Sequence, residues 1–271
     1  MTEGSFDTDF PLAVRNLTVR YGRVVALAGV SLEVPRGALY VLLGGAGAGK
    51  SSLAGCLLGS QKPTSGEAFF LGRNPRRRPL AKLLRRLGVP GRIPPAELPK
   101  GEAPLLGLSR ALGSRPEALV LDDPTALLDP SAARAFFQEL ARARLPGTTV
   151  LLLTSDPDGA ARIATHVGIL REGRLAVSGE IGDVLGRFRR IRYRNEVTED
   201  RTAYGTELDA FEAVRVKVRG WGVEAVVSNF DEDAFAAFAA TEGVVDAEAE
   251  ALSLREIFLA VAAERPSPAG P

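Results

Sequence analysis

The chain has 271 residues, of which 45% are hydrophobic and 25% charged, the composition of an ordinary globular protein. Its 34 Lys and Arg residues are balanced by 33 Asp and Glu residues, so no overall positive field favours a nucleic-acid partner. No apolar run approaches the ~20 residues of a membrane-spanning helix, the polar start MTEGSFDTDF is not a signal peptide, and the single cysteine, Cys56, excludes a disulfide within the chain. We therefore expect a soluble protein of a reducing cytosol, without nucleic acid, that reaches a membrane only through other proteins.

Two strands that alternate apolar and polar residues open the chain. The first is expected at Leu12–Arg20 and the second at Val24–Val34, and the turn Tyr21-Gly22 between them predicts an antiparallel pair. Tyr21 either packs at this turn or stacks on the adenine ring of a nucleotide, and both interpretations stay open.

A glycine-rich loop follows the third strand. The apolar run Leu39–Leu43 is typical of a buried parallel strand, and the next residues, GGAGAGKS, fit the phosphate-loop pattern G-x-x-x-x-G-K-[ST]. Glycines let backbone N–H groups curl around phosphates, and the N-terminus of the following helix adds partial positive charge. Lys50 is expected to reach the β- and γ-phosphates and the Ser51 hydroxyl to bind Mg²⁺, unless the segment is a glycine-rich turn without a ligand. The expected nucleotide-binding residues of this loop are Gly44, Gly45, Ala46, Gly47, Ala48, Gly49, Lys50, Ser51 and Ser52.

The middle of the chain is first basic and then proline-rich. A short strand is expected at Glu67–Leu71, and eight Lys and Arg residues without an acidic one lie between Arg73 and Arg92. This basic block is either a solvated helix face or a contact for acidic lipid headgroups or an acidic partner loop. Five prolines in Val89–Pro104 leave little room for regular structure, and a helix is expected at Leu105–Leu112.

Two more buried strands are expected at Ala118–Leu121 and Thr149–Leu153. The pair Asp122-Asp123 closes the first of them. A carboxylate in this position of a phosphate-loop protein indicates a ligand for Mg²⁺, here Asp122.

Helices are expected after both of these strands. One is amphipathic, at Pro130–Arg144, with Asp129 as its cap, and the other ends near Ala164. A hairpin at Val167–Val177 turns at Glu172-Gly173. The alternation of buried strands and helices predicts an α/β fold: a parallel sheet of the phosphate-loop NTPase type beside an antiparallel β-subdomain.

The pattern changes near residue 189 to that of a small α+β module. Its elements are expected at Ile191–Val197, Ala213–Arg219, Val223–Val227, Asp233–Thr241, Val244–Glu248 and a last helix opened by the capping box Ser253 and Glu256. We therefore expect a nucleotide-binding domain at residues 1–188, a C-terminal module at residues 189–262 and a disordered tail at residues 263–271.

These segments together resemble the nucleotide-binding subunit of ABC transporters, over nearly the whole chain. GGAGAGKSS resembles the Walker A loop, LVLDDPTALLDP the Walker B strand with the D-loop aspartate Asp129, and TVLLLTSDPDGA the strand and switch segment. Tyr21 falls at the position of the family's adenine-stacking aromatic residue. VGILREGRLAVSG resembles the hairpin after the switch, and SLREIFLAV the C-terminal helix of bacterial exporter-type (ABC-2-like) subunits.

The chain departs from this family at residues that act in ATP hydrolysis. Asp123 stands where the family usually has a glutamate that polarises the attacking water, so the resemblance implies a weak general base. Ser155 stands at the position of the switch histidine. The only histidine, His166, does not match this position and is interpreted as structural.

The chain also departs at groups that meet a partner subunit. The signature segment becomes Leu98–Glu102, in which Pro99 offers neither a hydroxyl nor an N–H group. No glutamine stands in Leu87–Arg92, where the family has one. The helical subdomain of the family is nearly absent, reduced to about residues 91–104.

The resemblance implies an ATP-binding subunit that holds ATP and Mg²⁺ in a membrane export or motility assembly. The implied partners are an integral-membrane permease and a second ATP-binding subunit, in a homodimer or a heterodimer, at the inner face of the cell membrane. Three functions stay open: nucleotide binding with weak or absent hydrolysis, a pseudo-ATPase with a structural or regulatory role, and an ordinary ATPase with Asp123 as general base.

Overall fold

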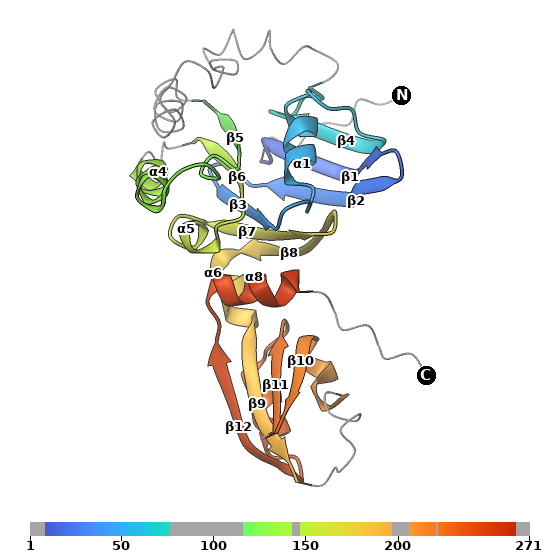
Figure 1. Ribbon diagram of the computed structural model, residues 1–271, viewed down its shortest axis with the longest axis vertical. Coiled ribbons are helices and arrows are strands. Elements are labelled where there is room, and N and C mark those ends of the chain that lie inside the picture. The colour runs from blue at the N-terminus through green and yellow to red at the C-terminus, as the bar shows by residue number, and fades with distance from the viewer. Residues whose placement is uncertain (1–8, 76–115, 143–146, 197–205, 221, 264–271) are drawn as a thin grey trace. The chain divides into compact units, whose positions relative to one another are not determined.

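The computed structural model describes residues 9–75, 116–142, 147–196, 206–220 and 222–263 (Figure 1). The chain divides into two compact units, Met1–Ser178 and Gly179–Pro271, each with its own hydrophobic core. This division precedes the change of pattern that the sequence shows near residue 189. The difference is the short helix α6, Ile181–Arg187, which joins the second unit because the Arg187 carbonyl accepts a hydrogen bond from the Phe230 N–H group (2.9 Å).

The first unit contains a three-stranded antiparallel sheet in the order β2-β1-β4. Its strands are β1 (Leu12–Tyr21), β2 (Val24–Val34) and β4 (Ser65–Phe70), which confirms the predicted hairpin and the predicted short strand. The alternation seen in the sequence places one face of β2 in the core. Val30, Leu32 and Val34 are buried, while Ser31 and Glu33 between them are exposed.

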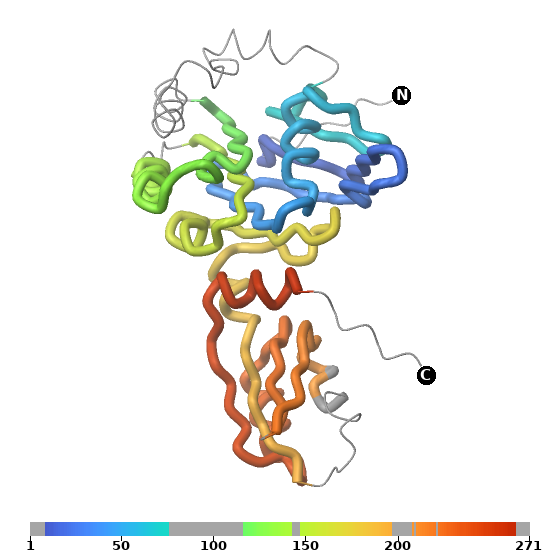
Figure 2. Tube along the Cα trace, in the orientation of Figure 1, coloured from blue at the N-terminus to red at the C-terminus, as the bar shows by residue number. Residues whose placement is uncertain are grey.

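The first unit also contains the five-stranded sheet, in the order β5-β6-β3-β7-β8, whose strands are labelled in Figure 1. Figure 2 traces the path of the chain in the same orientation. Its strands are β3 (Leu39–Gly44), β5 (Ala118–Asp122), β6 (Thr149–Thr154), β7 (His166–Arg171) and β8 (Arg174–Glu180). The pairs β5–β6, β6–β3 and β3–β7 are parallel. Every residue of β3 and β6 is buried, as expected for central strands of a parallel sheet.

Three helices of the first unit are α1 (Lys50–Leu57), α4 (Pro130–Arg142) and α5 (Pro157–Ala161). Helix α1 contacts strands of both sheets, and its Leu53 and Leu57 lie in the core that the two sheets share. The predicted cap of α4 is confirmed, because Asp129 Oδ1 accepts hydrogen bonds from the N–H groups of Ser131 (2.9 Å) and Ala132 (3.1 Å).

The second unit is an α+β module. After α6 its elements are β9 (Arg189–Asn195), the 3₁₀ helix η2 (Thr206–Phe211), β10 (Ala213–Arg219), β11 (Gly222–Val227), α7 (Glu232–Ala239), β12 (Val244–Ala251) and α8 (Leu254–Ala262). The antiparallel sheet has the order β10-β11-β9-β12, and its core includes an edge-to-face contact of Tyr193 with Phe238 (ring centroids 5.1 Å apart). The capping box of α8 is confirmed: Ser253 Oγ accepts from the Glu256 N–H group, and Glu256 Oε2 accepts from the Ser253 N–H group (3.0 Å).

Some predictions concern segments outside the described residues. These are the basic block from residue 76 onward, the proline-rich segment with the signature position, the helix at residues 105–112 and the tail at residues 264–271. Helix α5 ends at Ala161 rather than near Ala164, because the N–H groups of Arg162 and Ile163 bond to carbonyls only three residues earlier and Thr165 already bonds to Leu39 of β3. None of the helices in the described ranges combines the length and the apolar composition that a membrane span requires.

Candidate functional site

Three parallel strands end side by side at one edge of the five-stranded sheet. Asp122 of β5 lies beside Leu153 of β6, and Thr154 of β6 lies beside Leu43 of β3. The segments that follow these strands carry the glycine-rich loop, the carboxylate pair and Ser155. Ligands of open α/β sheets bind at this carboxyl edge. The structure thus brings the sequence-predicted site residues of three separate segments to one edge.

The loop between β3 and α1 has backbone conformations that favour glycine. Gly47 has a φ of 76° and Gly49 a φ of 104°, both in the left-handed region. A β-carbon on Gly49 would also lie 2.7 Å from Leu27 Cδ2 and still closer to the Ala26 carbonyl oxygen. Because α1 begins directly after Gly49, its unpaired N–H groups and the positive end of its dipole are at this loop. The loop therefore has the backbone arrangement that binds phosphate.

Lys50 folds back over the loop that precedes it. Its Nζ donates hydrogen bonds to the carbonyl oxygens of Gly44 (2.6 Å) and Gly45 (3.2 Å), and the residue is only 8% exposed. Among the described residues, no carboxylate forms an ion pair with this ammonium. The nearly buried positive charge is therefore held by neutral oxygens and is available to an anion.

Tyr21 lies beside the first turns of α1. Its Oη donates to Gln61 Oε1 (2.6 Å) and lies 3.2 Å from Ser52 Oγ, while the residue as a whole is 52% exposed. The hydroxyl end is fixed and half of the side chain faces solvent. This position is compatible with a stacking surface next to the loop. Gln61 is a residue of this region that the sequence analysis missed, because its contact joins segments forty residues apart.

The turn of the β7–β8 hairpin supports the glycine-rich loop from outside. The Gly173 N–H group donates to the Ala48 carbonyl (3.1 Å), and the Gly173 carbonyl accepts from the Ala28 N–H group (2.8 Å). Gly173 has a φ of 72°, and a β-carbon there would lie 2.6 Å from the Ala26 carbonyl oxygen. The sequence indicates the turn but not that the turn holds the phosphate loop.

The carboxylate pair has one exposed member and one member whose backbone is bonded to β6. Asp122 is exposed, whereas Asp123, with a φ of 43°, donates its N–H group to the Leu153 carbonyl (2.8 Å). Thr154 Oγ1 donates to Asp123 Oδ1 at 3.5 Å, and Ser155 beyond it is exposed. The Asp122 carboxylate and the exposed Ser51 hydroxyl are hard oxygen donors of the kind that Mg²⁺ prefers, so the residues present fit this ion.

His166 lies away from this edge. It begins β7 and pairs with Tyr40 near the start of β3, at the opposite end of the parallel strands. Its ring stacks on Tyr40 (ring centroids 6.2 Å apart), and its Nδ1 lies 3.1 Å from Thr165 Oγ1. Burial raises the pKa of Tyr40 to about 12, although a hydrogen bond with Ser178 lowers it in part. This position supports the structural interpretation of the histidine.

Comparison with known proteins places the chain in a family. The sequence model of the ABC transporter family matches residues 27–92, which include the glycine-rich loop. The aliphatic sulfonates import ATP-binding protein SsuB 1 of Nocardia farcinica is 34% identical over 204 residues, which cover 63% of this chain and 82% of that protein. The chain belongs to the ATP-binding proteins of ABC transporters. This confirms the predicted resemblance to the ATP-binding subunits of ABC transporters, while the exporter type stays a prediction from the sequence.

Other ABC relatives are considerably longer than the matching region. The methionine import ATP-binding protein MetN of Mesorhizobium japonicum is 30% identical over 219 residues, which cover 62% of this chain and 60% of that protein. The ribose import ATP-binding protein RbsA 1 of Rubrobacter xylanophilus is 31% identical over 225 residues, which cover 63% of this chain and 45% of that protein. The chain thus spans about half the length of these two relatives.

Solved ABC cassettes share the fold. A bacterial ABC transporter cassette solved as a dimer has a TM-score of 0.53 at 20% identity, covering 63% of this chain and 98% of that one. The cbiO1 protein of Clostridium perfringens, part of an ABC transporter complex, has a TM-score of 0.54 at 23% identity, covering 66% and 91%. The predicted phosphate-loop NTPase fold of the ABC type is confirmed.

Proposed function

We propose that this ABC protein binds Mg–ATP at the loop of residues 44–52 and hydrolyses it slowly or not at all. The observation that carries the proposal is Lys50, a nearly buried ammonium held over a glycine loop by two carbonyl oxygens. A polyphosphate offers this charge stronger, charged acceptors than those carbonyls. Nucleotide binding then uses a group that is already in place.

Each part of the nucleotide has a proposed contact. The phosphates bind to the N–H groups of the loop and to Lys50, and the adenine ring stacks on the exposed side of Tyr21. Ser51 and Asp122 hold Mg²⁺, which neutralises phosphate charge when it is bound.

Slow hydrolysis is proposed from the position of Asp123. An aspartate is one methylene shorter than glutamate, and the Asp123 backbone is fixed to β6 by its hydrogen bond to Leu153. The carboxylate also accepts a hydrogen bond from Thr154 Oγ1, which draws it toward β6. A displacement of about 1 Å from a general-base position costs on the order of 10²-fold in rate.

The transport role that we propose is the one that the relatives have in common, that of a transporter subunit. We propose that the chain works with an integral-membrane permease and a second ATP-binding subunit, identical or different, at the inner face of the cell membrane. The sequence alone predicts an export or motility assembly, whereas the relatives described above are import proteins. The names of these relatives support the role of transporter subunit and give no support to the export refinement.

Calorimetric titration with Mg–ATP tests the site. The wild-type chain is expected to bind, and Lys50→Ala to lose about 1.5–3 kcal/mol of binding free energy, roughly 10- to 150-fold in Kd. The control is Lys62→Ala, which removes an exposed lysine just beyond α1 and should bind like the wild type.

Two results would contradict the proposal. If Lys50→Ala binds as tightly as the wild type, the loop is not the phosphate site. If the wild type shows no saturable binding, alone or with candidate partner subunits, the chain is a pseudo-ATPase with a structural or regulatory role.

A further inference from the structure

The sheet of the second unit has one apolar and one strongly charged face. On β9, Ile191 and Tyr193 lie in the core, and the alternate residues Arg190, Arg192 and Arg194 lie on the opposite face. Most basic side chains of this charged face have carboxylate partners. The pairs are Arg190 with Glu250 and Glu256, Arg192 with Glu224 and Glu250, Arg194 with Asp246, and Arg219 with Glu224.

Two basic residues of the same face are exceptions. Arg215 and Lys217 stand two residues apart on β10, so both side chains lie on one side of this edge strand. Both residues are partly buried. Neither side chain forms an ion pair or a hydrogen bond with any residue in the described part of the chain. Two adjacent cations thus lack the compensation that their neighbours have.

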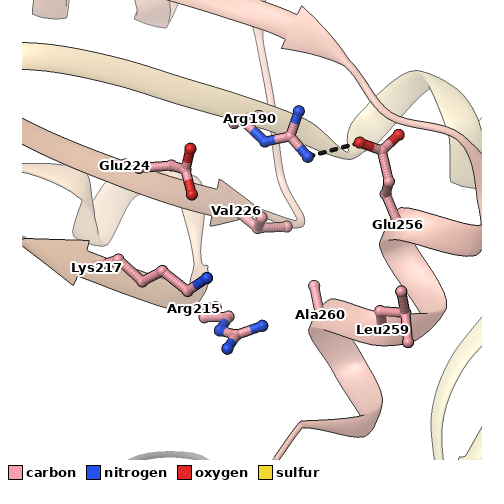
Figure 3. A pocket seen from close by; sticks show the side chains of 8 residues that line it. All are labelled: Arg190, Arg215, Lys217, Glu224, Val226, Glu256, Leu259 and Ala260. Carbon is pink, nitrogen blue, oxygen red and sulfur yellow. Dashed lines mark hydrogen bonds and ion pairs between the residues drawn. The ribbon is translucent and has the colours of Figure 1, made fainter. Parts of the chain in front are cut away.

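Arg215 and Lys217 line a cavity of about 190 Å³ between the charged face and helix α8. Figure 3 shows both side chains reaching from β10 toward the space in front of Ala260 and Leu259 of α8. The carboxylates at the cavity have other partners, since Glu256 pairs with Arg190 and Glu224 with Arg192 and Arg219. The cavity therefore has an excess of positive charge on its β10 side.

Besides these charged residues and Arg190, which pairs with Glu256, the cavity wall is apolar. Val226 of β11 and Leu259 and Ala260 of α8 complete the lining, and Leu259 is 54% exposed. A volume of 190 Å³ is below the roughly 300 Å³ at which pockets for drug-sized ligands begin. The occupant that matches this wall is small and has an anionic head and a short aliphatic part.

We propose that this cavity binds a small organic carboxylate. The guanidinium of Arg215 and the ammonium of Lys217 donate hydrogen bonds to the carboxylate of the ligand, because charge-assisted hydrogen bonds are the strongest that such groups form. The aliphatic chain of the ligand packs against Val226, Leu259 and Ala260. This site lies in the second unit and is separate from the nucleotide site of the proposed function.

The test is an NMR titration of the full chain, labelled at its valine and leucine methyl groups. The three probes are hexanoate, acetate with the charge but no chain, and 1-hexanol with the chain but no charge. Hexanoate should shift the Val226 and Leu259 methyl signals saturably, with a Kd about tenfold or more below those of acetate and 1-hexanol.

Variants with the same change of charge locate the binding. Arg215→Gln with Lys217→Gln should weaken hexanoate binding about tenfold or more. The control pair, Lys62→Gln with Arg174→Gln, removes two exposed cations outside the cavity and should leave the Kd unchanged. If the double variant loses its native methyl spectrum, Lys217→Gln alone should still weaken binding measurably.

Three results would overturn the proposal. They are the absence of saturable hexanoate shifts at these methyl groups, equal affinities for acetate and hexanoate, and unchanged binding in the Arg215 and Lys217 variants. Because the readout is confined to methyl groups of the second unit, it is independent of whether the first unit binds ATP.

Discussion

At the scale of single residues, we expect the Asp123 side chain to set the rate of ATP hydrolysis in this ABC protein. Asp123→Glu restores the length that the family usually has at this position and should raise phosphate release about 10- to 100-fold, because the carboxylate moves about 1 Å outward. Steady-state hydrolysis of Mg–ATP by the wild type, Asp123→Glu and Asp123→Asn measures this. A fast wild type that Asp123→Asn inactivates would instead identify an ordinary ATPase with Asp123 as its base.

A single substitution can also distinguish the two possible roles of Tyr21, adenine stacking and packing at the turn. If its half-exposed ring stacks on adenine, Tyr21→Ala should weaken ATP binding by ~1–3 kcal/mol, the range for base–aromatic stacking. Tyr21→Phe keeps the ring and loses the bonds to Ser52 and Gln61, so its affinity should stay within about twofold. Calorimetric titration of both variants measures this. Equal binding by Tyr21→Ala and the wild type would leave Tyr21 as a packing residue at the turn.

At the scale of elements, an ion pair joins helix α8 to the sheet of the second unit. The pKa of Glu256 is lowered from 4.5 to about 2, mainly by a hydrogen bond from the Arg190 guanidinium and to a smaller extent by hydrogen bonds from Ser253. Because the pKa is lower in the folded state, this stabilisation is fully present above pH 4.5. It is lost as the pH falls from 4.5 toward 2. Helix α8 should therefore loosen in acid before the core beneath it does.

Glu256→Gln isolates this charge, because glutamine still completes a capping box with Ser253. The Glu256 side chain is 40% exposed, so solvent screening limits the loss at pH 7 to about 1 kcal/mol. That corresponds to roughly fivefold less hydrogen-exchange protection of the α8 amides. The difference from the wild type should shrink below pH 4.5. Glu242→Gln, at an exposed position, is the control, and a difference that persists at pH 2 would exclude the ion pair as its cause.

At the scale of the whole molecule, local patterns predict most elements and miss the contacts between them. The runs of β3 and β6 are recognisable because both faces of a central parallel strand are apolar. The bond from Gly173 to Ala48 joins residues far apart in the chain, and no local pattern contains it. Arg215 and Lys217 have the pattern of a solvated strand face, and only the packing of α8 places an apolar wall beside them. The sequence does not reveal the division at Ser178 for a related reason. Helix α6 buries a single residue, Val184, so it lacks the apolar repeat of an amphipathic helix.

The two cores share no residue, so we expect the two units to open independently. A ligand present at 100 times its Kd stabilises the unit that binds it by about 2.7 kcal/mol, roughly 100-fold in exchange protection. Mg–ATP should therefore protect the amides of β3 and β6 by this factor and leave those of β9 and β11 unchanged. Hydrogen exchange with and without Mg–ATP measures both sets in one experiment, and Lys50→Ala at the same ATP concentration should lose most of the gain. Equal protection of both sets would show that the units unfold as one, because stabilisation by a ligand spreads only as far as the cooperative unit that contains its site.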